Sequence, residues 1–189
     1  MSKIIKKPYL IVVTSLFILS VISGAVDTLH DPEGARRSYD FLTDFLGSIR
    51  NKSTFEIFIF IFLNNSLKVL FSILLFFLFG IYPILMIVTN GLMIGSAGVI
   101  FANLKSQMWF IAAILPHGII EIPVFLLTMA ASLRLGIIFF QNLVKGKKDF
   151  KLEFRKTLIF FFKFLLPLYL VAAFVEAYVT PRIINLFNS

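Results

Sequence analysis

The apolar positions of this chain are gathered into long runs, whereas an amphipathic helix would space them every three or four residues. Five runs have the approximate limits 9–29, 57–79, 83–104, 108–140 and 157–179. A helix needs about 20 consecutive apolar residues to cross the hydrocarbon core of a bilayer. The pattern therefore predicts an all-α fold: a single membrane domain formed by a polytopic bundle of five or six transmembrane segments.

The segment count is open because the run at 108–140 is unusually long. As one helix, its roughly 33 residues would extend about 50 Å, more than one perpendicular crossing requires. Pro116 and Pro123 interrupt it. We expect either one kinked and tilted span, or a re-entrant arm that ends near Pro116 and is followed by a span.

The N-terminal part of the chain adds two expectations. Small residues at 23–25 would suit signal-peptide cleavage, but the apolar run before them is longer than a usual signal sequence, so we expect an uncleaved first span. In the polar segment 32–56, apolar residues recur at helical spacing with charges between them. They are Tyr39, Leu42, Phe45, Leu46 and Ile49. This spacing predicts a short amphipathic helix on the outer surface of the membrane.

Charge determines the expected orientation. The net charge is +8, yet the basic residues cluster in short segments between apolar runs, which is a topology signal and does not indicate nucleic-acid binding. The most basic loop is 141–156, and five crossings place it on the same side as the lysines of residues 1–7. We therefore predict a multi-pass protein of the cell membrane with a cytoplasmic N-terminus. The chain has no cysteine, which excludes disulfides and thiolate metal sites.

Ionisable and amide side chains inside the apolar runs are the candidate functional residues. His117 and Glu121 are four residues apart and would share one helix face. Counting 1.5 Å per residue places Asn65 and Glu176 with them in the outer half of the bilayer, and Asn90 somewhat deeper. Hydrocarbon disfavours such groups strongly, so we expect them to converge on one buried pocket.

Three readings of this pocket remain open. His117, Glu121 and Glu176 form a nitrogen and oxygen donor set that suits a divalent metal such as zinc, with Asn65 or Asn90 adding oxygen ligands. Alternatively, Lys68 neutralises a carboxylate and the remaining groups satisfy one another as structural hydrogen bonds. The third reading is a proton or solute path. HExxH, GxSxG and P-loop motifs are absent, so no catalytic residue is assigned.

Several sequence stretches resemble the stage II sporulation protein M family. They are Asn-Gly at 90–91 with Gly95, ILPHGIIEIP at 114–123 and AAFVEAYVTP at 172–181. The positions that match are Asn65, Asn90, Gly91, Gly95, Pro116, His117, Gly118, Glu121 and Glu176. The resemblance implies an integral membrane protein similar to a scaffold that holds cell-wall-degrading partners during engulfment. Members also occur in organisms that do not sporulate.

We therefore expect a non-enzymatic membrane scaffold or assembly protein with a buried cluster that holds a divalent metal. The alternative is an intramembrane metalloenzyme, or a transporter of small solutes or ions, that uses the same cluster. Gly91, Gly95, Pro116 and Gly118 are expected to serve helix packing, and the Gly91–Gly95 pair would suit a homodimer. The expected partners are the lipid bilayer and other membrane or envelope proteins.

Overall fold

The computed structural model describes residues 4–31, 33–34, 37, 52–146 and 149–186. These residues form helices and turns with no strand among them, and five helices are long and apolar enough to cross a membrane. The predicted all-α membrane bundle is confirmed. Most of the expected amphipathic segment 32–56 lies outside the described residues.

The five membrane helices follow one another along the chain. The first four are α1 (Lys7–His30), α3 (Thr54–Leu74), α4 (Ile81–Leu104) and α5 (Gln107–Lys145). The last is continuous but composite, and consists of α6 (Phe150–Phe160), the π turn η2 (Phe161–Leu165), α7 (Leu166–Phe174), the π turn η3 (Val175–Val179) and α8 (Thr180–Asn185).

Local sequence signals mark where the helices begin and end. Ser53 and Glu56 form a capping box that starts α3. A short 3-10 turn, η1 (Phe76–Leu78), follows α3, and the chain then reverses through Phe79 and Gly80, whose φ angles are 53° and 93°. Left-handed angles suit glycine because it has no Cβ. The α3–α4 connection is therefore a tight turn, and it contains no charged residue.

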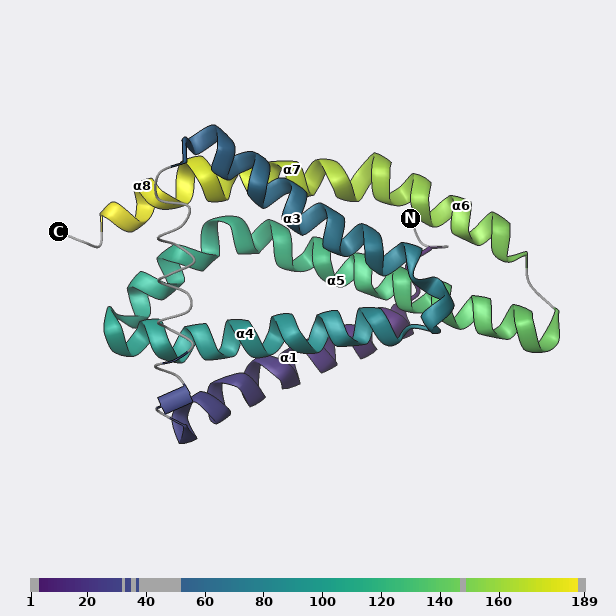
Figure 1. Cartoon of the computed structure of the whole chain (residues 1–189), viewed down its shortest axis with the longest axis horizontal. Helices are drawn as coiled ribbons and strands as arrows, with labels where there is room; N and C mark the ends of the chain where they lie inside the picture. Colours follow the sequence, from purple (N-terminus) through teal and green to yellow (C-terminus); the bar gives the residue numbers. More distant parts are fainter. Residues whose placement is uncertain (1–3, 32, 35–36, 38–51, 147–148, 187–189) are drawn as a thin grey trace.

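Helix α5 is the central element of the bundle. It contacts each of the other described elements, and it lies between the α1–α4 pair and the α3–α7 layer (Figure 1). Every residue from Thr128 to Gly136 is buried, so this stretch has no face toward lipid. Small residues such as Ala130, Ala131 and Gly136 allow neighbours to approach from all sides.

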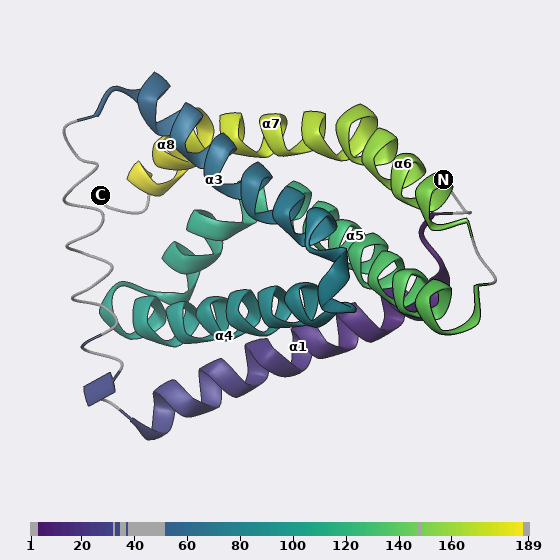
Figure 2. The same cartoon turned by 45° about the vertical axis from the view of Figure 1, so that its right-hand side comes forward.

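The N-terminal part of α5 bends away from the direction of the remainder (Figure 2). Pro116 and Pro123 both lie inside the helix. Each lacks the N–H of a regular helical hydrogen bond and crowds the carbonyl four residues earlier, which bends a helix. Of the two predicted arrangements, the structure shows one bent helix, and the bundle has five candidate spans.

Glycines bring α1 and α4 into close contact. A Cβ atom at Gly95 would lie 2.0 Å from the Val21 carbonyl oxygen, and one at Gly91 would lie 2.6 Å from the Ser20 Cβ. The Gly91–Gly95 pair therefore packs against α1 of the same chain. Because α1 covers this face, the pair lends no support to the expected homodimer.

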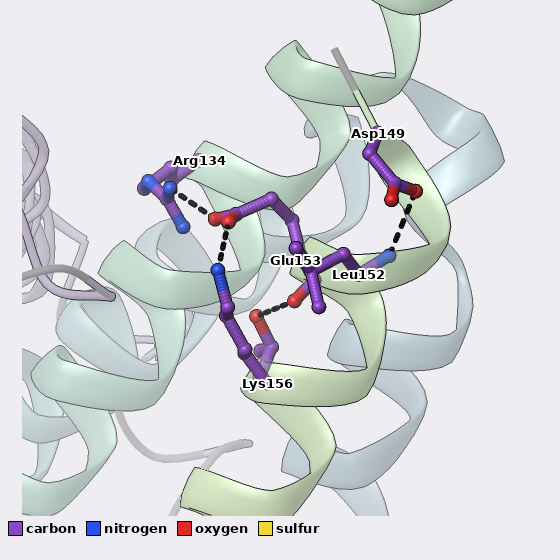
Figure 3. Close-up of polar contacts among 6 residues, drawn as sticks. Arg134, Asp149, Leu152, Glu153 and Lys156 are labelled. Carbon is purple, nitrogen blue, oxygen red and sulfur yellow. Dashed lines mark hydrogen bonds and ion pairs between the residues drawn. The ribbon is translucent and has the colours of Figure 1, made fainter.

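A buried ion pair joins α5 to α6 at the end of the bundle where α1 begins (Figure 3). The Arg134 guanidinium donates to the Glu153 carboxylate, and Lys156 Nζ donates to Glu153 Oε1 over 2.9 Å. The Arg134 side chain is 7% exposed. Glu153 thus compensates a charge that would otherwise be isolated in the interior.

We predict that Gly95→Ala destabilises the bundle by about 1–3 kcal/mol, because the added methyl group meets rigid backbone of α1. Gly98→Ala is the matched control in the same helix, since its Cβ would lie 3.2 Å from the Phe110 side chain. Thermal unfolding of detergent-purified protein measures both. Equal stability of the two variants would contradict the proposed close contact.

We further predict that Glu153→Gln destabilises the protein by about 3–5 kcal/mol, because it leaves the buried Arg134 charge without its partner. Lys156→Gln should cost far less, since Lys156 is 42% exposed and Arg134 retains Glu153. The same unfolding measurement compares the two variants. A Lys156→Gln variant as unstable as Glu153→Gln would show that the buried pair is not the determining interaction.

Candidate functional site

Helix α5 and the last helix bring His117, Glu121 and Glu176 together. His117 and Glu121 lie one turn apart on α5, and Glu176 lies in the π turn η3. One potential ligand atom from each residue lies within 4.8 Å of the other two. All three side chains are half-buried. We call this group the acid–histidine cluster.

Glu176 is placed by an irregular helical turn. Thr180 Oγ1 donates to the Val175 carbonyl oxygen, five residues earlier, over 3.3 Å. Pro181 follows directly and cannot donate to the carbonyl of Ala177. A wider turn before the proline relieves the crowding. Such π turns occur frequently at functional sites, and here the turn carries a carboxylate.

Asn65 connects α3 to the acid–histidine cluster. Its Nδ2 donates to Glu121 Oε1 over 2.7 Å, and its own Oδ1 accepts from Asn64 Nδ2 over 3.2 Å. Both polar ends of the Asn65 amide are therefore engaged. In this arrangement Asn65 orients Glu121. Its Oδ1 retains a second lone pair, so the expected role as an oxygen ligand stays a prediction.

Two further polar residues lie near the cluster. Thr180 Oγ1 lies 3.5 Å from His117 Nδ1, and Thr180 is buried. Our sequence interpretation missed Thr180, although its position beside Pro181, directly after the last apolar run, was visible. Asn90 on α4 donates through Nδ2 to the Met86 carbonyl oxygen of its own helix over 2.7 Å. Asn90 is thus outside the three-residue group.

The cluster opens onto a cavity of about 250 Å³. Its lining comes from α1, α3, α4, α5 and η3, and comprises Phe17, Asn64, Asn65, Lys68, Asn90, Met93, Ile94, Ile114, His117, Gly118, Glu121, Ile122, Phe125 and Glu176. A cavity of this size can hold an ion with several waters. The predicted convergence of the polar residues on one pocket is thus present in the structure.

Lys68 makes no direct ion pair with the cluster, although its charge interacts with Glu121, in line with the predicted neutralisation of a carboxylate. It lines the cavity and its side chain is exposed. The ion pairs within the described ranges involve Asp31, Glu33 and Glu153 as acceptors. Glu121 and Glu176 therefore face each other without a basic residue in direct contact.

Gly118 contributes to the cavity and not to contact between helices. A Cβ atom there would approach only Ile114 and Ile122 of the same helix, at 3.1 and 3.6 Å. We had grouped Gly118 with the packing glycines, but the absence of a side chain at this position instead leaves space beside His117. Pro116 lies inside α5, where an interior proline favours a bend of the helix.

The donor set has a clear chemical preference. One imidazole nitrogen and two carboxylates suit zinc and other first-row divalent ions, and sulfur is not required. Two carboxylates that share a low-dielectric site repel each other unless a cation or a proton lies between them. Three protein ligands would leave a fourth metal position open toward the cavity.

We predict that Asn65→Ala lowers stability by about 1.5–3 kcal/mol, because Glu121 loses a charge-assisted hydrogen bond. Asn64→Ala is the matched control, since Asn64 contacts Asn65 and not Glu121. Thermal unfolding in detergent compares them. If Asn64→Ala were the more damaging change, the proposed support of Glu121 would be wrong.

Comparison with known proteins identifies the family. The model of the family described as stage II sporulation protein M matches residues 13–181. A search of curated proteins and a search of solved structures found no match. The matched range includes parts of all five membrane helices and the whole acid–histidine cluster. The chain therefore belongs to the stage II sporulation protein M family.

Proposed function

We propose that this protein is a multi-span membrane scaffold or assembly protein, and that its acid–histidine cluster binds one divalent metal ion, such as zinc. The observation that carries this proposal is the position of three ligand atoms within 4.8 Å of one another on two helices. The function is structural: the metal holds the bundle in the shape that other membrane or envelope proteins recognise.

The distances in the cluster are compatible with one ion. Ligands about 2.1 Å from a tetrahedral zinc ion are about 3.4 Å apart. Because the three atoms of the cluster lie within 4.8 Å of one another, they would have to approach by up to about 1.4 Å, which side-chain rotations can supply. The bound cation would also relieve the repulsion between Glu121 and Glu176.

A metal in this position would link three helices. His117 and Glu121 belong to α5, which contacts every other described element, and Glu176 belongs to the last helix. Asn65 extends the link to α3 through its bond to Glu121. Such a link would make the relative positions of these helices depend on the metal, as a structural role requires.

The cavity supports a second candidate function. Catalytic zinc sites have three protein ligands and an open position for water or substrate, and the cluster has three ligands beside a cavity of about 250 Å³. An intramembrane metalloenzyme or a transporter would use this space. In that case, changing a ligand would abolish turnover or transport while the bundle remained folded.

We also infer that the N-terminal end of the bundle faces the cytoplasm of the cell. The beginning of α1 and the connection between α5 and α6 lie at the same end in both views (Figures 1 and 2). The basic segments of the sequence, at 1–7 and 141–156, flank these points. Excess Lys and Arg favours the cytoplasmic side of a membrane.

Metal analysis of the full chain purified in mild detergent tests the proposal. We predict about one divalent ion per chain, with binding weakened at least about 10-fold in His117→Ala, Glu121→Gln and Glu176→Gln. His30→Ala is the matched control, because His30 lies at the end of α1, and among the described residues its Nδ1 contacts the Val26 carbonyl oxygen of its own helix over 2.8 Å.

The same preparation separates the two candidate functions. For a structural metal, chelation should lower the unfolding temperature and reduce recovery of crosslinked partners together. For a catalytic metal, chelation should leave the unfolding temperature nearly unchanged. If the purified chain contained no metal, and neither zinc nor chelator changed its unfolding temperature, the metal site would be refuted in both forms.

A further inference from the structure

A second hollow lies on the side of the last helix that faces away from the bundle. It has a volume of about 750 Å³ and is lined by Lys151, Phe154, Arg155, Leu158, Ile159, Phe162 and Lys163. We call it the α6 groove, since all its lining residues belong to α6 and η2. Its surface is almost wholly apolar: four apolar side chains line it, three cationic side chains border it mainly through their hydrocarbon stems, and no carboxylate is among them.

The nearby carboxylates are directed elsewhere. Glu153 is bound by Arg134 and Lys156 on another face of α6, and Asp149 accepts from the Leu152 backbone N–H over 3.1 Å (Figure 3). Among the described residues, no ion pair involves Lys151, Arg155 or Lys163. The groove therefore carries positive charge without an internal counter-charge.

Lys163 is the most informative residue of the groove. It lies inside the last apolar run, yet its side chain is exposed on the surface that would face lipid. Its ammonium lies 5.7 Å from the centroid of the Phe164 ring. A lysine at this depth is costly unless its long side chain reaches polar groups at the membrane interface or meets an anion.

The three cations share one stripe of the helix with an apolar residue. Lys151, Arg155, Ile159 and Lys163 follow one another at four-residue intervals, which places them on the same side of the helix. Phe162, beside the stripe, is 51% exposed. A ligand that fits would combine negative charge near the helix start with an apolar portion that extends into the bilayer.

We propose that the α6 groove binds an anionic phospholipid. The phosphate lies against Lys151 and Arg155 near the helix start, and the long Lys163 side chain extends toward the same interface, because guanidinium and ammonium groups bind phosphate oxygens through charge-assisted hydrogen bonds. One acyl chain follows Leu158, Ile159 and Phe162. A free phosphate ion would leave this apolar lining unused, which favours the lipid. This site is independent of the acid–histidine cluster.

Native mass spectrometry of the full chain tests the site. The detergent-purified protein is titrated with an equal mixture of phosphatidylglycerol and phosphatidylcholine. We expect phosphatidylglycerol to be enriched about tenfold or more among bound lipids. The variant Lys151→Gln/Arg155→Gln/Lys163→Gln should lose this preference. Lys52→Gln/Lys105→Gln/Arg182→Gln removes the same charge outside the groove and should retain it.

Photocrosslinking on the unmodified protein gives an answer even if the variant folds poorly. Phosphatidylglycerol with a photoreactive acyl chain is reconstituted with the full chain in phosphatidylcholine vesicles. We expect the label to concentrate in the peptide that contains residues 151–163. A label spread evenly over the lipid-facing helices would overturn the proposal.

The remaining outcomes are equally decisive. No preference for phosphatidylglycerol in the unmodified protein, or full preference in the groove variant, would refute the site. Excess inorganic phosphate should fail to displace the lipid. If phosphate alone displaced it completely and protected the protein equally against unfolding, the groove would be an anion site and not a lipid site.

Discussion

Hydrocarbon offers no hydrogen bonds, so a polar group inside the bilayer must find its partner within the protein. Helix α5 brings several such groups into the bundle, and their partners come from other helices. Glu121 accepts a hydrogen bond from Asn65 on α3, and Arg134 pairs with Glu153 on α6. These bonds connect α5 to its neighbours at two levels of the bundle. One level contains the acid–histidine cluster, and the other contains the Arg134–Glu153 pair. The burial of α5 on all sides at its middle follows from this role as the common partner.

The two levels differ in how charge is compensated. At one level, the Arg134 and Glu153 charges cancel in a closely packed contact. At the other, the two carboxylates of the acid–histidine cluster lie beside a cavity with no basic residue in direct contact. A structural core would normally fill such a space with apolar side chains. The retained cavity and the two carboxylates without a directly bonded cation are the observations on which the proposed ion rests.

Some of this could be read from local patterns along the chain. His117 and Glu121 share a helix face because of the helical period, and Glu176 falls in the outer half of the bilayer because it lies near the end of the last apolar run. Arg134 was also visible as a lone cation in an apolar run, although our interpretation of the sequence overlooked it. Its partner Glu153 could not be inferred, since α5 and α6 meet only after the chain reverses between them.

Hydropathy and run length depend only on residues that are neighbours in the sequence. They were sufficient by themselves to determine the class of fold and the approximate positions of the apolar spans. Only the tertiary structure decided how each helix is rotated about its axis. It directed the Gly91–Gly95 pair toward α1, turned the Asn65 amide to donate to Glu121, and bent α5 at its N-terminal part. Helix rotation depends on the packing of side chains distant in sequence, and one chain's local pattern does not contain that information.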